Sequence, residues 1–218
     1  MKLFLLTIIV MLSLSAFSQS FSGRIVYSTN VESSDSTYGY IDYQKAKYGD
    51  SLIVSLGESG KMRKDYIGAG NPGFEFNILN PESEFSVHKF TYSDSIFLGN
   101  KSLEPTQLIR IDTLNNDIFL NRNCEVYKLE VLETNEESFQ TWDVTVWLDK
   151  NIKIDSELYN DWIEGHWNVI SGLNGGMYLK MITSNGIMSI TYSAMRVEDI
   201  EIDDSLFDYD ERNLILID

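Results

Sequence analysis

Few residues in this sequence are suited to metal or nucleophilic chemistry, and their spacing matches no common motif. The two histidines, His88 and His166, and the single cysteine, Cys124, lie far apart and lack the spacing of a metal site. The segment around His166 also lacks the second histidine, one helical turn away, that a zinc protease needs. We therefore predict no metal ligands, no cofactor and structural histidines. His166 is the one placed to reach a pocket rim, because it lies close to Trp162 and Trp167.

Two other kinds of reactive group remain to be considered. Residues 57–61 (Gly-Glu-Ser-Gly-Lys) look like part of a phosphate-binding loop, but the glycines are too close together and no Ser or Thr follows the lysine. A hairpin turn is the better prediction for them. The 33 acidic residues could supply the carboxylate pair of a glycoside hydrolase, yet no spacing singles out a pair. An envelope hydrolase with paired carboxylates therefore stays open as an alternative, with no catalytic residue assigned.

The first eighteen residues indicate export. Lys2 precedes an apolar run over residues 3–14, and small residues stand at the −3 and −1 positions of a cut after Ser18. This pattern is typical of a cleavable signal peptide, and the run is too short for an ordinary membrane-spanning helix. We predict residues 1–18 to be a signal peptide and residues 19–218 to be one β-rich domain without a transmembrane segment. The protein would then be periplasmic, outer-membrane-associated or secreted.

Composition limits the partners. The formal net charge is −16, which disfavours binding to nucleic acid because such binding needs a basic surface. A mature chain of this length buries about 70% of its unfolded surface and needs no disulfide. Cys124 has no second cysteine to pair with, and we predict it to be a small buried residue of a strand.

The apolar residues alternate with the period of strands. Short runs rich in Tyr, Phe, Ile, Val and Thr are separated by turn residues about every ten positions, which predicts an antiparallel sheet. Asn185-Gly186 is the strongest hairpin signal, joining residues 177–183 to residues 187–197. Residues 155–163 form the best helix candidate, with Asp155 or Ser156 as the cap. We predict a mainly β fold, a strongly curved sheet or incomplete barrel with one short helix.

Two of these strands carry a continuous apolar face. A curved sheet of this size commonly encloses a cavity between such faces, and the sequence has many large, adaptable side chains to line one. The ligand-binding residues that we predict on this basis are Trp142, Val144 and Val146 on one strand and Met188, Ile190 and Tyr192 on another.

Several segments resemble an exported Bacteroidetes family of unknown function that is named for its Gly-Leu-Pro-Gly-Leu-Ile signature. Residues 21–27 (FSGRIVY) are similar to its first strand, residues 121–127 (NRNCEVY) to its strand with a single cysteine, and residues 146–149 (VWLD) to its Trp-containing strand. Residues 171–179 (SGLNGGMYL) lie where the signature would be, although Asn174 replaces its proline and Gly-Met replaces its Leu-Ile. The ending 204–207 (DSLF) is instead similar to that of a neighbouring family, whose fold looks like the half-barrel of periplasmic lipoprotein carriers.

We therefore expect a non-enzymatic binding module of the envelope or exterior that holds an apolar small molecule or lipid. The hydrolase alternative stays open, and so does a third one, a scaffold in an outer-membrane or secretion complex. A large apolar pocket would favour the first, two facing acids the second, and an exposed apolar patch without a cavity the third.

Overall fold

Strand-forming residues dominate the structure as they dominate the sequence. The computed structural model describes residues 21–35, 39–100, 106–134, 139–160, 162 and 164–217, so the predicted signal peptide lies outside the described residues. The described residues form one 13-stranded sheet. Its strands are β1 (Gly23–Ser33), β2 (Ser51–Leu56), β3 (Met62–Ile67), β4 (Phe74–Leu79), β5 (Phe85–Phe90), β6 (Ile96–Asn100), β7 (Thr106–Thr113), β8 (Asp117–Phe119), β9 (Arg122–Thr134), β10 (Phe139–Lys153), β11 (Gly176–Ser184), β12 (Met188–Glu198) and β13 (Leu214–Ile217).

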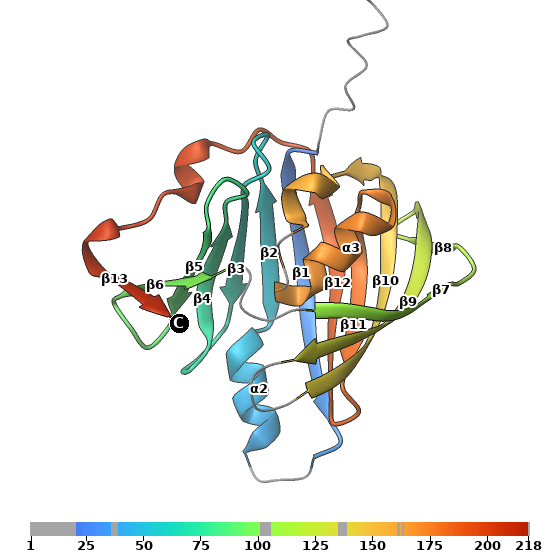
Figure 1. The fold of residues 1–218 in the computed structure, drawn as a ribbon, viewed down its shortest axis with the longest axis horizontal. Helices are drawn as coiled ribbons and strands as arrows, with labels where there is room; N and C mark the ends of the chain where they lie inside the picture. Colours follow the sequence, from blue (N-terminus) through green and yellow to red (C-terminus); the bar gives the residue numbers. More distant parts are fainter. Residues whose placement is uncertain are drawn as a thin grey trace, which may run out of the picture.

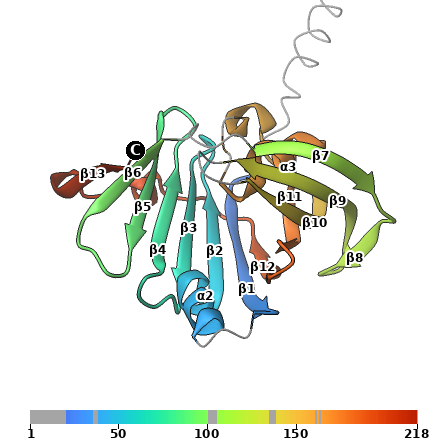
Figure 2. The same cartoon turned by 60° about the horizontal axis from the view of Figure 1, so that its bottom comes forward.

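The strands lie along an arc that does not close. Their order is β13-β6-β5-β4-β3-β2-β1-β12-β11-β10-β9-β7, with β8 paired to β9. Figures 1 and 2 show the two ends of this arc apart, with β13 and β6 at one end and β7 and β8 at the other. All pairings are antiparallel except that of β13 with β6. The predicted mainly β, incomplete barrel is therefore confirmed.

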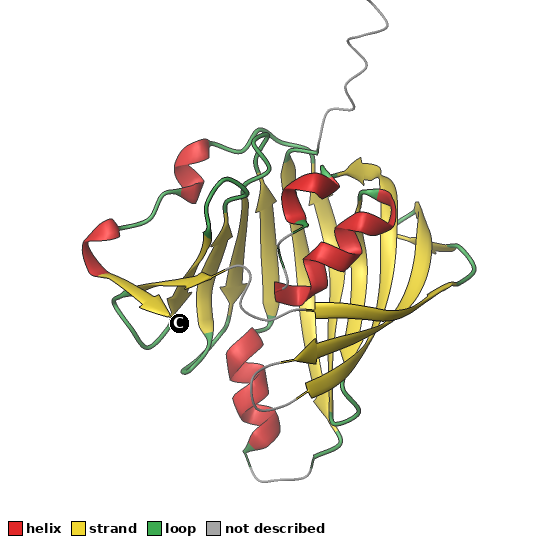
Figure 3. Cartoon of the chain, in the orientation of Figure 1, coloured by secondary structure: helices red, strands yellow, loops and turns green. Residues whose placement is uncertain are grey.

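Helices are short and lie beside the sheet (Figure 3). They are α2 (Tyr40–Tyr48), α3 (Trp167–Asn174) and the 3-10 turns η1 (Ser156–Tyr159), η2 (Glu164–His166), η3 (Asp204–Phe207) and η4 (Glu211–Asn213). Among the described residues, no helix has both the length and the hydropathy to cross a bilayer.

The predicted helix over residues 155–163 is only partly correct. Asp155 does cap a turn, because its side chain accepts a hydrogen bond from the backbone N–H of Glu157, but η1 ends at Tyr159. The chain then passes through Gly165 and His166, whose φ angles of 66° and 62° are left-handed and interrupt any helix. The longer helix, α3, begins only after this reversal. The sequence analysis did not predict α2, whose one buried residue is Gln44, so the helix has no apolar stripe.

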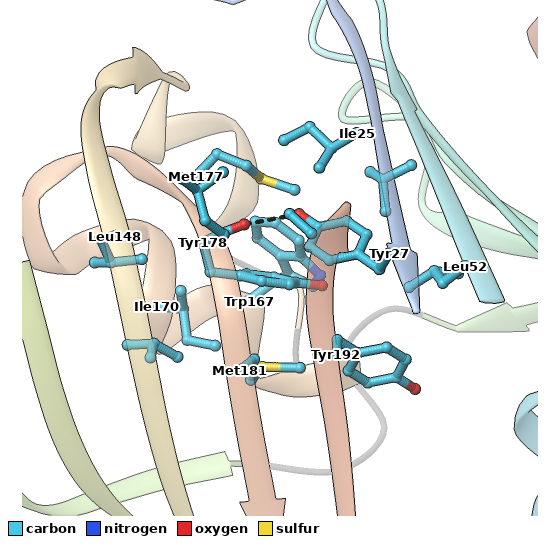
Figure 4. Packing of buried hydrophobic residues seen from close by; sticks show 14 of the residues in the cluster. Ile25, Tyr27, Leu52, Leu148, Trp167, Ile170, Met177, Tyr178, Met181 and Tyr192 are labelled. Atoms are coloured by element: carbon cyan, nitrogen blue, oxygen red, sulfur yellow. Dashed lines mark hydrogen bonds between the residues drawn. The ribbon is translucent and has the colours of Figure 1, made fainter. Parts of the chain in front are cut away.

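The main core fills the inside of the arc, under η1, Trp162, η2 and α3, which together we call the helical segment. On β10, Val144, Val146 and Leu148 are fully buried and alternate with outward residues, as the sequence predicted. Figure 4 shows Trp167 and Ile170 of α3 packing between residues of β1, β10 and β11. At the centre, the hydroxyl of Tyr27 on β1 donates a 2.7 Å hydrogen bond to the carbonyl oxygen of Tyr178 on β11.

A second, smaller core lies on the other face of β4 to β6. Ile78, Val87 and Ile96 pack there against Ile202 and Phe207 of the C-terminal segment. The guanidinium of Arg63 donates a 2.9 Å hydrogen bond to the backbone carbonyl of Leu206 and fixes this segment to β3. The sheet therefore buries apolar side chains on both faces at this end.

Cys124 is buried on β9, as predicted, with 1% of its surface exposed. Burial raises the pKa of its thiol, and the nearby charge of Asp149 acts in the same direction. Because the thiolate is the reactive form, we predict that a thiol reagent labels native protein slowly at pH 7.5 and unfolded protein rapidly. Rapid labelling without denaturant would contradict this assignment.

The carboxylate of Asp149 is the most buried charged group on β10, with none of its side chain exposed. It accepts a 2.8 Å bond from Arg122 and two 2.9 Å bonds from the backbone and side-chain amides of Asn151. We predict that Asp149→Ala lowers the free energy of unfolding by about 3 kcal/mol, because it leaves these donors without their charged partner.

The matched control is Asp143→Ala on the same strand. The Asp143 side chain is 63% exposed, and its ion pair with Lys128 has a long N–O distance of 3.7 Å. An exposed pair of this kind contributes at most about 1 kcal/mol. Urea unfolding measures the free energy of unfolding of both variants. If both lose the same amount relative to wild type, the buried contacts of Asp149 contribute no more than the exposed pair of Asp143.

A candidate ligand-binding cavity

A cavity of about 580 Å³ lies between the concave face of the sheet and the helical segment. This volume is in the range of about 300–1,000 Å³ that is usual for small-molecule sites. Strands from both halves of the arc contribute to its walls, as do Trp162, Gly165, His166 and Trp167 of the helical segment. Three residues from more distant parts complete the lining, Lys47 and Tyr48 on α2 and Ile217 on β13.

One wall, formed by β11 and β12, is mainly apolar. Met181 pairs with Tyr192 across these strands, and Thr183 pairs with Ile190, so all four side chains share the concave face. Figure 4 shows Met181 and Tyr192 together on this face, near Trp167 of the helical segment. The hydroxyl of Thr183 is buried and has no hydrogen-bond partner among the described residues.

The opposite wall, formed by β3 to β6, combines polar and aromatic rows. The cross-strand register places Lys64 next to Asn77 and Asn77 next to His88, so these three side chains form a polar row on the concave face. Lys64 and His88 line the cavity. Beside this row, the rings of Phe74 and Phe90 stack with centroids 4.9 Å apart.

Ser86 and His88 form a close polar contact in this wall, with 2.6 Å between Ser86 Oγ and His88 Nε2. A serine nucleophile would have to donate its proton to that nitrogen. The Ser86 hydroxyl also lies 3.1 Å from the carbonyl oxygen of Gly99, to which it donates. With the serine proton directed there, the tautomer of His88 that carries a proton on Nε2 donates to Ser86, and the hydroxyl links β5 to β6.

Glu133 is the single carboxylate among the described lining residues. Its Oε2 accepts a 2.8 Å hydrogen bond from the indole N–H of Trp142, and its Oε1 lies 3.5 Å from Nδ1 of His166. Burial lowers the pKa of His166 to about 4, so the imidazole is neutral at pH 7 and this second contact is not an ion pair there. The described lining therefore lacks the pair of facing acids that the hydrolase alternative requires.

The six predicted ligand-binding residues divide into two groups. Trp142, Ile190 and Tyr192 line the cavity. Val144, Val146 and Met188 are buried in the surrounding core, outside the lining. The sequence reasoning missed the wall formed by β3 to β6. A signal was present, since Lys64 alternates with Met62 and Tyr66 and so takes an inward position in its strand.

The comparisons with known proteins give no family. No protein-family model matches the sequence, and no curated protein matches it. Among solved structures, a domain described as an outer membrane lipoprotein-sorting protein from Vibrio parahaemolyticus is similar over 85% of this chain and 89% of its own, with 7% sequence identity and a TM-score of 0.36. A similarity at this level carries no argument about function, and the resemblance to the Gly-Leu-Pro-Gly-Leu-Ile family stays a prediction.

His166 should make the stability of the protein depend on pH. Its pKa is about 4 in the folded chain and about 6.5 when unfolded, so between these values the unfolded chain binds the proton and the folded chain does not. Stability is therefore full above pH 6.5 and falls as the pH drops toward 4. We predict that this linkage removes about 2 kcal/mol between pH 7 and pH 5.

The test compares wild type with His166→Asn in urea at both pH values. Asparagine is chosen because it tolerates the left-handed backbone of this position. The variant should lose about 2 kcal/mol less than wild type over this pH range, whatever its stability at pH 7. An identical loss in both proteins would show that folding does not shift the titration of His166.

Proposed function

We propose that this protein is a non-enzymatic envelope or exported binding module that holds an apolar or amphipathic ligand in the cavity. The observation that carries the proposal is the cavity itself, about 580 Å³ of space beneath the helical segment with an apolar wall of Met181, Ile190 and Tyr192. Export with cleavage after Ser18, and a single β-rich domain over residues 19–218, belong to the same proposal and derive from the sequence pattern.

The driving force would be removal of apolar ligand surface from water. Burying about 500 Å² of such surface contributes about 12 kcal/mol at about 25 cal/mol per Å². Association costs of at least about 4 kcal/mol are subtracted from this, and the remainder corresponds to a Kd in the micromolar range. Because this attraction has no direction, the apolar wall alone would accept many ligands of suitable size.

Filling the cavity should block binding. Thr183 lines the apolar wall and is 8% exposed, so we predict that Thr183→Phe places its ring in the cavity and weakens binding of the neutral dye N-phenyl-1-naphthylamine at least tenfold. Dye fluorescence, which rises in apolar surroundings, measures the Kd. Thr191→Phe is the matched control, because Thr191 pairs with Ile182 and faces away from the cavity on the neighbouring strand.

The control should bind the dye as wild type does. No saturable dye binding to the wild-type protein, or equal weakening in both variants, would overturn the cavity as the binding site. Native mass spectrometry of protein purified from its host provides a second readout, since an occupied cavity would retain a co-purifying small molecule.

The scaffold alternative keeps one observation in its favour. All four residues of β13, Leu214–Ile217, are exposed apolar residues at an end of the sheet. Exposed strand edges of this kind can accept a strand from a partner. If the protein acts as a scaffold, Leu216→Glu should remove a host complex seen by native size-exclusion chromatography. If it acts through the cavity, the dye affinity of this variant stays unchanged and no complex is lost.

A further inference from the structure

Resting on the function proposed above, we infer that the ligand of the cavity contains a flat aromatic ring system, with the rings of Tyr66, Phe74 and Phe90 as its main contacts. We call these three residues the aromatic row. The volume of the cavity and its apolar wall leave the ligand class open, since both would also accept a flexible chain or a saturated ring. The aromatic side chains of the lining narrow that choice.

Aromatic residues dominate the lining. Phe, Tyr and Trp make up 12% of the whole chain, but they account for nine of the 23 lining residues that the structure describes. Three of the four tryptophans of the chain are among them. The branched aliphatic residues of the described lining are Leu52, Ile190 and Ile217. The excess of rings is therefore a property of the cavity and does not follow from the composition of the chain.

The aromatic row crosses three strands of the wall formed by β3 to β6. Tyr66 lies on β3, Phe74 on β4 and Phe90 on β5, and Phe74 is opposite Phe90 in the register. Successive ring centroids are 5.3 and 4.9 Å apart, with interplanar angles of 34° and 29°. This arrangement is close to offset stacking, which aromatic pairs favour. A further ring can join such a series by stacking on its end or by turning a face toward the ring edges.

The rings of the row have surface to offer to a ligand. All three line the cavity and are half-buried. Rings that serve only the core, such as those of Tyr27 and Tyr159, have at most 1% of their surface exposed. On the opposite wall, Tyr192 and Met181 lie together near Trp167 (Figure 4). A ligand between the two walls therefore has aromatic groups on both sides.

A flat aromatic ligand gains more from these contacts than a chain does. Ring pairs attract beyond the effect of the area that they bury, because the negative face of one ring meets the positive edge of another. The thioether of Met181 also contacts ring edges favourably. A rigid ring system loses no internal rotations on binding, whereas a flexible chain must be ordered. A saturated ring shares this rigidity but lacks the attraction between rings.

Three uncharged alcohols with eleven carbons each test the inference. They are 1-naphthalenemethanol, its fully hydrogenated counterpart and 1-undecanol, and each is used to displace N-phenyl-1-naphthylamine from the wild-type protein at pH 7.5. We expect the naphthalene compound to bind at least tenfold more tightly than the other two. This ratio corresponds to about 1.4 kcal/mol, and so to about one contact between rings. The saturated compounds have more hydrocarbon surface, so burial of area alone predicts the opposite order.

The decisive variant is Phe74→Leu, which keeps an apolar side chain in the middle of the aromatic row and removes its ring. It should lose most of the preference for the naphthalene compound and bind the hydrogenated counterpart as wild type does. Tyr92→Leu is the matched control. The Tyr92 ring also stacks on Phe90, with centroids 5.4 Å apart, but Tyr92 is 54% exposed and lies outside the described lining. This control should keep the preference of wild type.

The outcomes separate this inference from the function on which it rests. Equal affinity of wild type for the three alcohols, or an unchanged preference in Phe74→Leu, would overturn the aromatic ligand and leave the binding function standing. A wild-type protein that does not bind the dye would overturn the function itself. If Phe74→Leu does not fold by circular dichroism, Phe90→Leu decides the inference, because Phe90 belongs to the same row and should carry the same preference.

Discussion

A column of four aromatic rings holds the helical segment against the sheet, and both the core and the cavity depend on it. Tyr27 packs on Tyr178, Tyr178 on Trp167 and Trp167 on Tyr159, with successive centroids 5.3, 5.4 and 5.9 Å apart. Buried hydrogen bonds fix both ends, one from Tyr27 to the backbone of Tyr178 and one of 2.6 Å from Tyr159 to the carbonyl of Gly60. The column thus ties β1, β11 and the β2–β3 turn to the helical segment.

This attachment explains why the concave face is filled on one side and hollow on the other. The rings and α3 cover β10 and β11, where Leu148 and Ile170 are fully buried. The cavity lies on the other side, where residues of β3 to β6 form part of its lining. The hollow side is also where Lys64 and His88 stand. Polar side chains therefore border the unfilled space on this wall.

The strands were predictable from the sequence, but the site was predictable only in part. Alternation sufficed for the inward faces of β10 and β12, and Asn185-Gly186 marked the hairpin between β11 and β12. The helix over residues 155–163 was misjudged because local spacing does not report the left-handed reversal at Gly165 and His166. The wall that contains Lys64 was missed for a different reason. Its residues come from several strands. Long-range contacts decide which strands pair and how they lie against the helical segment, and the spacing of apolar residues does not report such contacts.

The order of the strands has a consequence for how the chain folds. Strands β1 to β6 follow each other in sequence along the sheet, and so do β9 to β12, so the pairings within each half join strands that are neighbours in sequence. The two halves join at the seam of β1 with β12, where Gly23–Ser33 meets residues more than 150 positions later. Closing a loop of that length has a large entropic cost and slows folding. Because the cavity takes its polar wall from one half and its apolar wall from the other, it can exist only after the seam has formed, which makes ligand binding a late event and couples it to completion of the sheet.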